Sequence, residues 1–265
     1  MSDRFKGLSP QRVVLVTAGA SGIGGTIAKA FRREECRVHV CDISATAVEQ
    51  ILAENPGTTA TVADAALPGD VDRVFADLKG HHGRLDILVN NVGIAGPTAL
   101  VENVTVDDWD KTIAVDLNAQ FYFTRLAVPM LKESGGGSIV NISSSAAFFG
   151  FPLRSPYTAA KWAMIGLTKT WAMELGPHKI RVNAICPGSV KGKRIDTVIE
   201  RDAQARGIDP ESVRRAWVKQ TSLELFVEAE DIANMALFLC SDLGATISGQ
   251  AIGVDGQTET LSNKA

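Results

Sequence analysis

The chain has 265 residues, of which 45% are hydrophobic and 22% charged, and its formal net charge at pH 7 is −3. This length can bury one large hydrophobic core, and the weak acidity gives no reason to expect nucleic acid or an anionic membrane as a partner. No apolar run reaches membrane-spanning length, and the first residues lack the apolar core of a signal peptide, so we expect a cytoplasmic protein.

Short runs rich in β-branched residues alternate along the chain with longer, helix-like stretches. The short runs predict β-strands, in chain order, at 12–17, 37–42, 59–64, 85–91, 137–144, 179–187 and 249–255. The longer stretches predict helices at 22–34, 44–54, 70–79, 107–133, 155–175 and 229–242. We expect Ser44 to be the N-cap of the second helix, and we expect the helix at 155–175 to stop at Gly176-Pro177.

The predicted strands show no regular alternation of polar and apolar residues. This pattern is typical of a parallel sheet with helices on both faces. No internal repeat or low-complexity linker divides the chain, so we predict one doubly wound α/β domain over residues 1–265. The four cysteines have no metal-ligand spacing, so reduced buried thiols and no metal site are expected; they are Cys36, Cys41, Cys186 and Cys240.

The first predicted strand runs into a glycine-rich turn, "TAGASGIGG" (Thr17–Gly25). A strand, a glycine-rich turn and a helix N-terminus together form an anion site, because backbone N–H groups and the helix dipole face the anion. The next strand ends at Asp42, 18 residues after Gly24. A carboxylate at that place accepts hydrogen bonds from ribose hydroxyls and repels a 2′-phosphate, which favours NAD. The alternative is that Asp42 only caps a helix.

Tyr157 and Lys161 are four residues apart in "SPYTAAKWAM", so both lie on one face of the predicted helix. A lysine cation beside a phenol favours the phenolate, which suits the tyrosine to proton transfer at an alcohol or carbonyl oxygen. The preceding strand ends in "NISSS", whose serine hydroxyls can bind the same oxygen. A tyrosine and a lysine one turn apart are by themselves more often part of a solvated helix edge.

Taken together, these motifs resemble the short-chain dehydrogenase/reductase family. The resemblance rests on "TAGASGIG", on "NNVG" (Asn90–Gly93), on "NISS" ahead of "YTAAK", and on "PGSV" (Pro187–Val190). It covers about Gly7 to Gly256. It implies a Rossmann-type fold, NAD(P)-dependent oxidation of an alcohol or reduction of a carbonyl, and a homotetramer.

The resemblance also implies a role for each matching residue. Tyr157 is then the catalytic acid/base, Lys161 favours its phenolate and holds the nicotinamide ribose, and Ser144 orients the substrate. Ser143 and Ser145 stand close enough to exchange this last role with Ser144. The implied cofactor contacts are Ser21, Gly22 and Ile23 at the pyrophosphate, Asp42 at the ribose, Asp64 and Ala65 at the adenine, Asn91 bracing the cofactor, and Val190 at the carboxamide, besides Tyr157 and Lys161.

Four positions depart from the usual family pattern. Ala18 replaces the first glycine of the turn, and we expect Gly19 to absorb the turn instead. Asp116 stands where an asparagine usually supports a proton relay near the lysine, so we expect it either to couple to the Tyr157–Lys161 pair or to bind elsewhere. Gly192 replaces a threonine that usually contacts the carboxamide, and Gln257 replaces a glycine in "VDGQ".

The segment 191–222 is expected to cover the substrate, since this region does so in the family. It holds eight basic and five acidic residues, a net excess of three positive charges in a chain of net charge −3. An anionic substrate fits this excess, but for any single one of these residues a solvated helix face with i,i+4 ion pairs is the more common explanation. The apolar stretch Ala146–Leu153 is expected to form another wall of the substrate pocket or part of the core.

We therefore predict an NAD-dependent oxidoreductase that interconverts a small secondary alcohol and its ketone, with anionic alcohols among the candidate substrates. One alternative is a carbonyl reductase similar to 3-oxoacyl-(acyl carrier protein) reductases. Another is a cofactor-binding protein without catalysis, against which the presence of Ser144, Tyr157 and Lys161 argues.

Overall fold

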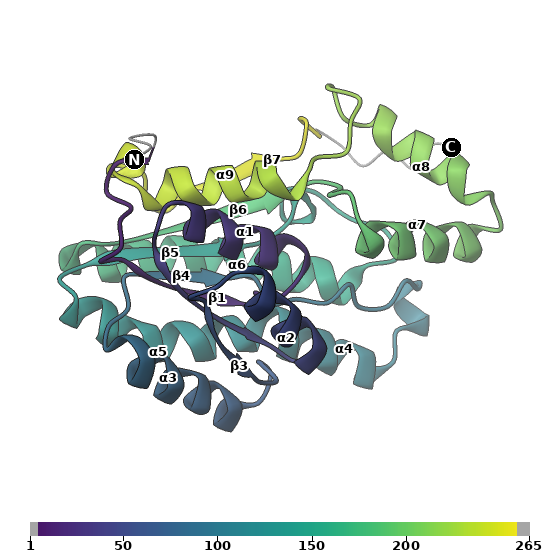
Figure 1. Ribbon diagram of the computed structural model, residues 1–265. Helices are drawn as coiled ribbons and strands as arrows, with labels where there is room; N and C mark the ends of the chain where they lie inside the picture. Colours follow the sequence, from purple (N-terminus) through teal and green to yellow (C-terminus); the bar gives the residue numbers. More distant parts are fainter. Residues whose placement is uncertain (1–4, 259–265) are drawn as a thin grey trace.

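The computed structural model describes residues 5–258, which form a parallel sheet of seven strands in the order β3-β2-β1-β4-β5-β6-β7 (Figure 1). Every pairing between neighbouring strands is parallel. The strands are β1 (Val13–Thr17), β2 (Arg37–Asp42), β3 (Thr59–Val62), β4 (Ile87–Asn90), β5 (Gly137–Ile142), β6 (Ile180–Pro187) and β7 (Ala251–Val254). The strand order reverses direction between β1 and β4, which opens a crevice at their carboxyl ends.

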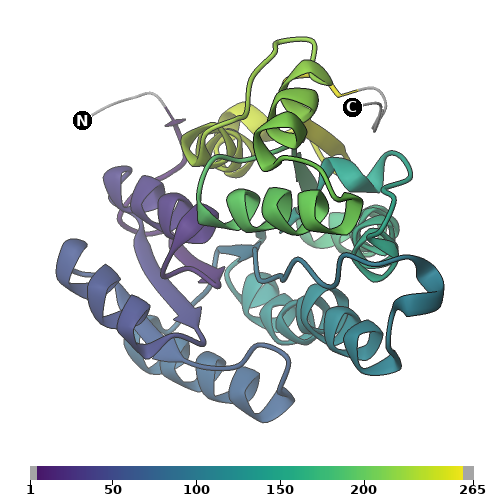
Figure 2. The same cartoon turned by 90° about the vertical axis from the view of Figure 1, so that its right-hand side faces the viewer.

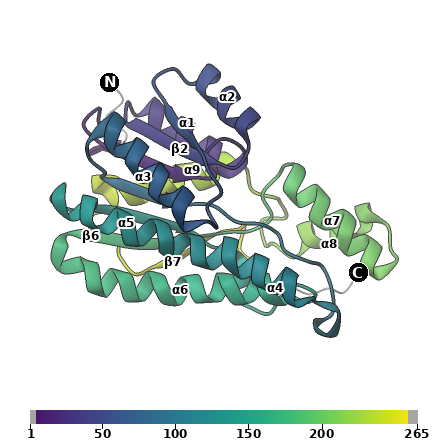
Figure 3. The same cartoon turned by 90° about the horizontal axis from the view of Figure 1, so that it is seen from below.

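Helices cover both faces of this sheet (Figure 3). One face carries α1 (Gly22–Arg33), α2 (Ala45–Glu54) and α9 (Ala229–Cys240), whose Phe31, Ile51 and Ile232 share one hydrophobic cluster. The other face carries α3 (Pro68–His82), α5 (Ala119–Glu133) and α6 (Ser155–Leu175), whose Val74, Phe123 and Met164 share a second cluster. The predicted α/β fold, with a parallel sheet covered on both faces, is confirmed.

The helix boundaries follow local sequence signals. Ser44 caps α2 as predicted, because its side chain accepts a hydrogen bond from the backbone N–H of Ala47. Helix α3 begins at Pro68, two residues before the predicted start, since proline fits the first turn of a helix, where no N–H is needed. Helix α6 ends at Leu175, directly before Gly176-Pro177, as predicted.

The predicted helix at 107–133 is not continuous. It begins as α4 (Val106–Ile113), widens into a π-helical turn at Ala114–Asn118, and continues as α5. A π turn holds one residue more than an α turn, so it rotates the side chains that follow it, and such turns occur frequently at functional sites. Asp116 lies in the middle of this π turn.

The segment 191–222 folds into two helices, α7 (Lys193–Arg206) and α8 (Pro210–Lys219), which lie beside one end of the sheet (Figures 2 and 3). They have a small hydrophobic cluster of their own, which includes Ile199, Val213 and Trp217. This cluster is separate from the two that cover the sheet, so the pair packs as a local unit against the carboxyl ends of the strands.

All four cysteines are free thiols. Burial raises the pKa of the Cys36 thiol to about 11 and the pKa values of Cys41, Cys186 and Cys240 to about 12. Between residues 5 and 258, no three side chains of the metal-ligating types lie close enough to share an ion. Within the same range, no helix has the length and hydropathy required to cross a bilayer.

Candidate active site

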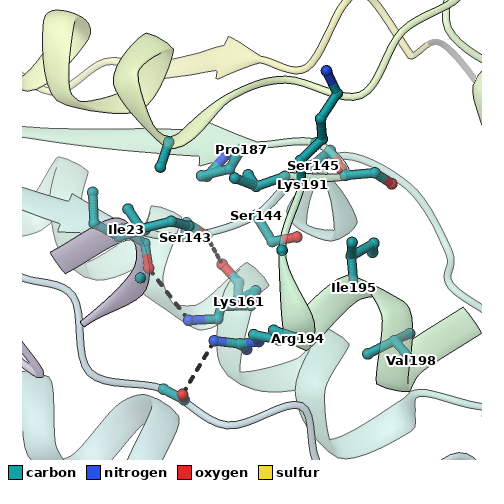
Figure 4. Close-up of a pocket in the computed structure, with 18 of the residues that line it drawn as sticks. Ile23, Ser143, Ser144, Ser145, Lys161, Pro187, Lys191, Arg194, Ile195 and Val198 are labelled. Atoms are coloured by element: carbon teal, nitrogen blue, oxygen red, sulfur yellow. Dashed lines mark hydrogen bonds between the residues drawn. The ribbon is translucent and has the colours of Figure 1, made fainter. Parts of the chain in front are cut away.

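A cleft of about 610 Å³ opens at the carboxyl ends of the strands, between the sheet and the pair α7–α8 (Figure 4). Nine of the predicted site residues line it: Ser21, Gly22, Ile23, Asp42, Asn91, Ser144, Tyr157, Lys161 and Val190. Three others do not line it: Asp64, Ala65 and Asp116. The fold thus brings the predicted cofactor turn and the predicted catalytic residues to one cavity.

The N-terminus of α1 is open toward this cleft. Its N-cap, Ser21, makes no side-chain cap hydrogen bond, and the first turn of α1 has no acidic residue. At Gly22, with φ at 54°, a Cβ would meet no atom within 4 Å, whereas at Gly24 it would collide with the Ala18 carbonyl and the Asn91 side chain. Unpaired N–H groups, open space and the absence of acidic groups fit a pyrophosphate.

The prediction that Gly19 absorbs the missing first glycine is wrong. Ala18 itself takes the left-handed conformation, with φ at 46°, and Asn91 Nδ2 donates hydrogen bonds to the carbonyl oxygens of Thr17 (3.0 Å) and Ala18 (3.1 Å). Gly19 is required for another reason, since a Cβ there would lie 2.6 Å from the Val16 carbonyl oxygen. The turn therefore keeps its shape despite a side chain at a position that favours glycine.

Gln257, near the other end of the described chain, likewise adopts a left-handed conformation although it is not a glycine. It also replaces a glycine of the family pattern, and its φ is 63°. Its backbone N–H donates to Asp255 Oδ1 (2.9 Å), which helps to hold the turn. A left-handed conformation costs a residue with a Cβ roughly 1–2 kcal/mol, so Ala18 and Gln257 each hold their turn at a modest energetic cost.

The carboxylate of Asp42 lies at the end of β2 and joins the turn to the start of α2. Oδ2 accepts a hydrogen bond from the Ala20 N–H (3.2 Å), and Oδ1 accepts one from the Ser44 N–H (3.1 Å). The capping alternative is thus present, but Asp42 also lines the cleft, and a carboxylate has further lone pairs for ribose hydroxyls.

Asp64 and Ala65 lie beyond the end of β3, outside the residues that line the cleft. Asp64 Oδ1 accepts a hydrogen bond from the Ala66 N–H (2.9 Å), and the Asp64 N–H donates to Asp70 Oδ2 (2.8 Å). These bonds give Asp64 a structural role in the turn before α3. Contact of Asp64 and Ala65 with an adenine remains a prediction.

Tyr157 and Lys161 both project from α6 into the cleft. Lys161 is buried, its Nζ donates to the Ile142 carbonyl oxygen (3.3 Å), and it lies 5.5 Å from the centre of the Tyr157 ring. Figure 4 shows Lys161 among the lining residues, close to Ser143 and Ser144. The predicted pair is therefore close enough for the cation to act on the phenol.

Ser143 and Ser144 differ in the hydrogen bonds that their hydroxyl groups form. The Ser143 hydroxyl donates to the Lys161 carbonyl oxygen (2.9 Å), so its proton is engaged with the backbone of α6 (Figure 4). The Ser144 Oγ accepts from the Ala146 N–H (3.1 Å), which leaves its own proton available to an oxygen in the cleft. This arrangement favours Ser144 as the substrate-orienting hydroxyl.

Asp116 reaches Lys161 from the side away from the cleft. Its side chain is 0% exposed, Oδ1 accepts from the Ile94 N–H (2.7 Å), and Oδ2 lies 3.8 Å from Lys161 Nζ. Oδ2 finds no hydrogen-bond partner in the part of the chain that the structure describes. Burial raises the pKa of the Asp116 carboxyl, while the Lys161 cation and the Ile94 N–H act in the opposite direction.

We expect the Asp116→Asn variant to keep its activity and to move the alkaline-rising limb of alcohol oxidation to lower pH by roughly 0.5 to 1 unit. An ionised Asp116 partly cancels the positive field of Lys161 at the phenol, so its neutralisation strengthens the preference for the phenolate. The rate of oxidation, followed against pH, measures the effect.

The control for this variant is Asp110→Asn, which removes the same charge from an exposed position on α4. Its pH profile should match that of the unmodified protein. If the Asp116→Asn profile also remained unchanged, Asp116 would not couple to the pair Tyr157 and Lys161.

Two arginines line the cleft that the sequence motifs did not single out as site residues. Arg154 is buried at the N-cap of α6, and Arg194 extends from α7 and donates to the Gly93 carbonyl oxygen (3.2 Å) (Figure 4). The sequence did hold one signal for Arg154. A cation directly before Ser155-Pro156, at a helix N-terminus, opposes the helix dipole and is an unusual choice.

Two other arginines of the segment 191–222 form ion pairs with acidic residues of the same segment. Arg214 binds Asp196, with 2.5 Å between nitrogen and oxygen, and Arg206 binds Asp202 at 2.9 Å. These pairs support the simpler explanation of the basic excess at those positions. The apolar wall that faces the arginines comes from Phe151, Ile195, Val198 and Trp217.

Comparison with known proteins places these features in context. A family model described as enoyl-(acyl carrier protein) reductase matches residues 17–256. A 3-oxoacyl-[acyl-carrier-protein] reductase of Thermotoga maritima is 34% identical over 258 residues, which are 92% of this chain and 96% of that protein. A D-beta-hydroxybutyrate dehydrogenase of Rhizobium meliloti is 32% identical over 252 residues, covering 92% and 97% of the two chains.

Solved structures show the same fold. An NAD+-bound xylitol dehydrogenase superposes with a TM-score of 0.90 at 25% identity, over 95% of this chain and 100% of that one. Two further ketoreductase structures, at 28% and 27% identity with TM-scores of 0.85 and 0.89, hold NADH and NADPH respectively. Proteins of this fold thus bind either form of the nicotinamide cofactor.

Proposed function

The chain belongs to the short-chain dehydrogenase/reductase family and is an NAD(P)-dependent oxidoreductase, and from this premise we propose that it interconverts a secondary alcohol and its ketone with NAD as the preferred cofactor. The observation that carries the proposal is the single cleft in which Ser144, Tyr157 and Lys161 face the open N-terminus of α1. A cofactor held at that helix and a substrate held at Tyr157 share this cavity.

When bound, the cofactor supplies or accepts a hydride at its nicotinamide ring. In the direction of oxidation, Tyr157 takes the proton of the substrate hydroxyl, and Ser144 holds the same oxygen with a hydrogen bond. The Lys161 ammonium lies 5.5 Å from the centre of the Tyr157 ring and is held there by its hydrogen bond to the Ile142 carbonyl oxygen, so its positive charge stabilises negative charge that develops on the Tyr157 oxygen during proton transfer. In the direction of reduction, Tyr157 returns the proton to the oxygen.

The preference for NAD is supported by Asp42, whose carboxylate lines the cleft at the end of β2. A 2′-phosphate placed there would meet a like charge, while free ribose hydroxyls would meet an acceptor. The remaining cofactor contacts proposed are Ser21, Gly22 and Ile23 at the pyrophosphate, Asp64 and Ala65 at the adenine, Asn91 as a brace, and Val190 at the carboxamide, with Lys161 at the ribose.

The alternative of a 3-oxoacyl reductase is supported by the relative of that name at 34% identity. It predicts turnover of acyl thioesters in preference to free alcohols. The alternative of a cofactor-binding protein without catalysis predicts binding of NAD and no turnover. The presence of all three catalytic side chains in one cleft argues against it.

The test is an NAD-coupled screen of secondary alcohols, sugars, hydroxy acids, aryl carbinols and a 3-oxoacyl thioester. We expect at least one class of free secondary alcohol to be oxidised, with NADH formation dependent on Tyr157. Turnover of the thioester alone would favour the 3-oxoacyl reductase, and binding of NAD without any turnover would contradict catalysis.

We also propose a homotetramer, in line with the family resemblance. Support comes from large apolar side chains that stand exposed on neighbouring helices of one face: Val106 and Trp109 on α4, Phe121 on α5, and Trp162 and Met173 on α6, the last of them 81% exposed. Contiguous exposed apolar surface is typical of protein–protein contacts. Light scattering in solution measures the number of subunits.

A further inference from the structure

We propose that this cleft selects alcohols that carry a carboxylate close to the reacting carbon, and that Arg154 is the residue that binds this carboxylate. The inference deepens the proposed function, on which it rests, by naming the substrate class as short hydroxy acids and the corresponding oxo acids. No sequence motif of the chain assigned Arg154 to the site.

Arg154 is a buried cation without an anionic partner. Arg154 is only 4% exposed, and among residues 5–258 no carboxylate forms an ion pair with it. Nη2 donates to the Ala95 carbonyl oxygen (2.6 Å) and Nη1 to Thr98 Oγ1 (3.3 Å), both neutral acceptors. Buried charges normally have a partner of opposite sign, because an uncompensated one is costly.

The unused hydrogen-bonding capacity of Arg154 is also buried. Nε has no hydrogen-bond partner within the described chain, although its accessible area is near zero. A guanidinium offers five N–H donors in a planar fork that matches both oxygens of a carboxylate. Burial lowers the pKa of Arg154; Arg194 and Arg201 act in the same direction, whereas Tyr157 and Asp116 act in the opposite direction. An anion in the cleft would accept hydrogen bonds from the free N–H groups of the guanidinium and reduce its repulsion with Arg194 and Arg201.

The position of Arg154 sets how far the carboxylate lies from the reacting carbon. Its guanidinium carbon is 5.2 Å from the centre of the Tyr157 ring and 5.6 Å from that of Phe151, and all three residues line the cleft. A substrate oxygen at the Tyr157 hydroxyl and a carboxylate at the guanidinium are therefore only a few bond lengths apart. This placement favours a 2-hydroxy or 3-hydroxy acid over a substrate with its charge at the far end of a long chain.

The electrostatic surroundings favour an anion at this place. Arg154 stands at the N-cap of α6, so the positive end of the helix dipole adds to the charge of the guanidinium. Arg194 lines the same cleft, and its Nη1 donates to the Gly93 carbonyl oxygen, again a neutral acceptor. Two buried carboxylates also interact with Arg154 at longer range, and neither lines the cleft: Asp116, which lies beside Lys161, and Asp202, which pairs with Arg206.

A purely structural role for Arg154 makes a different prediction. The two bonds to Ala95 and Thr98 tie the start of α6 to the loop after β4. If Arg154 did nothing else, its loss would weaken turnover of charged and neutral alcohols equally. Binding of a carboxylate instead predicts a loss confined to charged substrates.

The experiment compares 2-hydroxybutyrate and 3-hydroxybutyrate with the corresponding hydroxybutanamides, at saturating NAD. We expect the unmodified enzyme to prefer at least one of the acids over its amide. In Arg154→Gln, kcat/KM for that acid should fall about 10- to 100-fold, mainly through KM, because a hydrogen bond to a charged group is lost. The amide should change by less than about 3-fold.

The matched control is Arg215→Gln, which removes the same charge from an exposed position on α8 outside the cleft lining. It should leave both activities unchanged. Equal losses of acid and amide turnover in Arg154→Gln, or oxidation of neutral alcohols without any preference for the acids, would overturn the inference and leave the proposed function intact. Absence of turnover with every alcohol would instead contradict the proposed function.

A binding measurement tests Arg154 without turnover. In the presence of NAD, millimolar butyrate should raise the thermal midpoint of the unmodified protein by about 2 °C, and butyramide should not. Arg154→Lys, which keeps the charge but lacks the planar pair of donors, should retain part of the shift. The same shift with butyramide, or no shift with butyrate, would count against a carboxylate site.

Discussion

Replacement of Tyr157 by phenylalanine is expected to lower kcat by about 10²- to 10⁴-fold, the usual contribution of a positioned acid/base. The substitution removes only the hydroxyl. The ring keeps its contacts with Arg154 at 5.2 Å and Lys161 at 5.5 Å, so the cleft should retain its shape. The dissociation constant of NAD should therefore remain within about 3-fold of that of the unmodified protein, as expected when ground-state binding is preserved.

Tyr122 provides the matched control, because it is the other of the two tyrosines in the chain. It lies on α5, its ring packs against Phe121, and it does not line the cleft. Tyr122→Phe should keep full activity. If Tyr157→Phe also kept most of its kcat, the proton would have to pass through another group, and the proposed role of Tyr157 would be wrong.

The second large effect is expected at Asp42, where the Ala variant should shift the ratio of kcat/KM for NAD to that for NADP by about 100-fold toward NADP, since a like-charge contact costs several kcal/mol. The shift has two parts. NAD loses an acceptor for its ribose hydroxyls, and NADP no longer meets the carboxylate. Steady-state kinetics with both cofactors measure the ratio.

Asp42→Ala also removes the hydrogen bonds from the N–H groups of Ala20 and Ser44, so its stability must be followed alongside its kinetics. Glu49→Ala serves as the control, because it removes an exposed acidic side chain from α2 without touching the cleft. It should leave the cofactor ratio unchanged. Comparable kcat/KM for NAD and NADP in the unmodified protein would contradict the assigned preference.

The sheet and the covering helices could be predicted from the sequence because strands that are buried on both faces consist of nearly continuous apolar residues. Strand β1 reads "VVLVT", and all five of its residues are buried. The glycine-rich turn, the acidic strand end and the Tyr–Lys pair are each short motifs at the end of a predicted strand or on a predicted helix. Their place in the fold therefore follows from the order of these elements along the chain. Asp42, Asn91, Tyr157 and Lys161 were placed in one cleft for this reason.

Three features of the structure could not be predicted from sequence patterns, because contacts between distant parts of the chain determine them. The π turn at Ala114–Asn118 adds one residue to a helix whose periodicity gave no sign of it, and it brings Asp116 to the Ile94 N–H. The left-handed conformation of Ala18 depends on the two carbonyl contacts of Asn91. The burial of Arg154 depends on the loop after β4, which is distant in sequence.

The lining of the cleft extends from Ala18 to Thr258 and draws on nearly every strand end between them. The anion turn, the proton-transfer pair and the apolar wall are far apart in the sequence and meet only in the folded sheet. During synthesis, α1 and its turn emerge long before α6, and the segment that covers the substrate emerges later still. The complete cleft therefore requires strands that are distant in the sequence to pair, and such long-range pairing is intrinsically slow. A chain in which these strands have not yet paired lacks part of the lining.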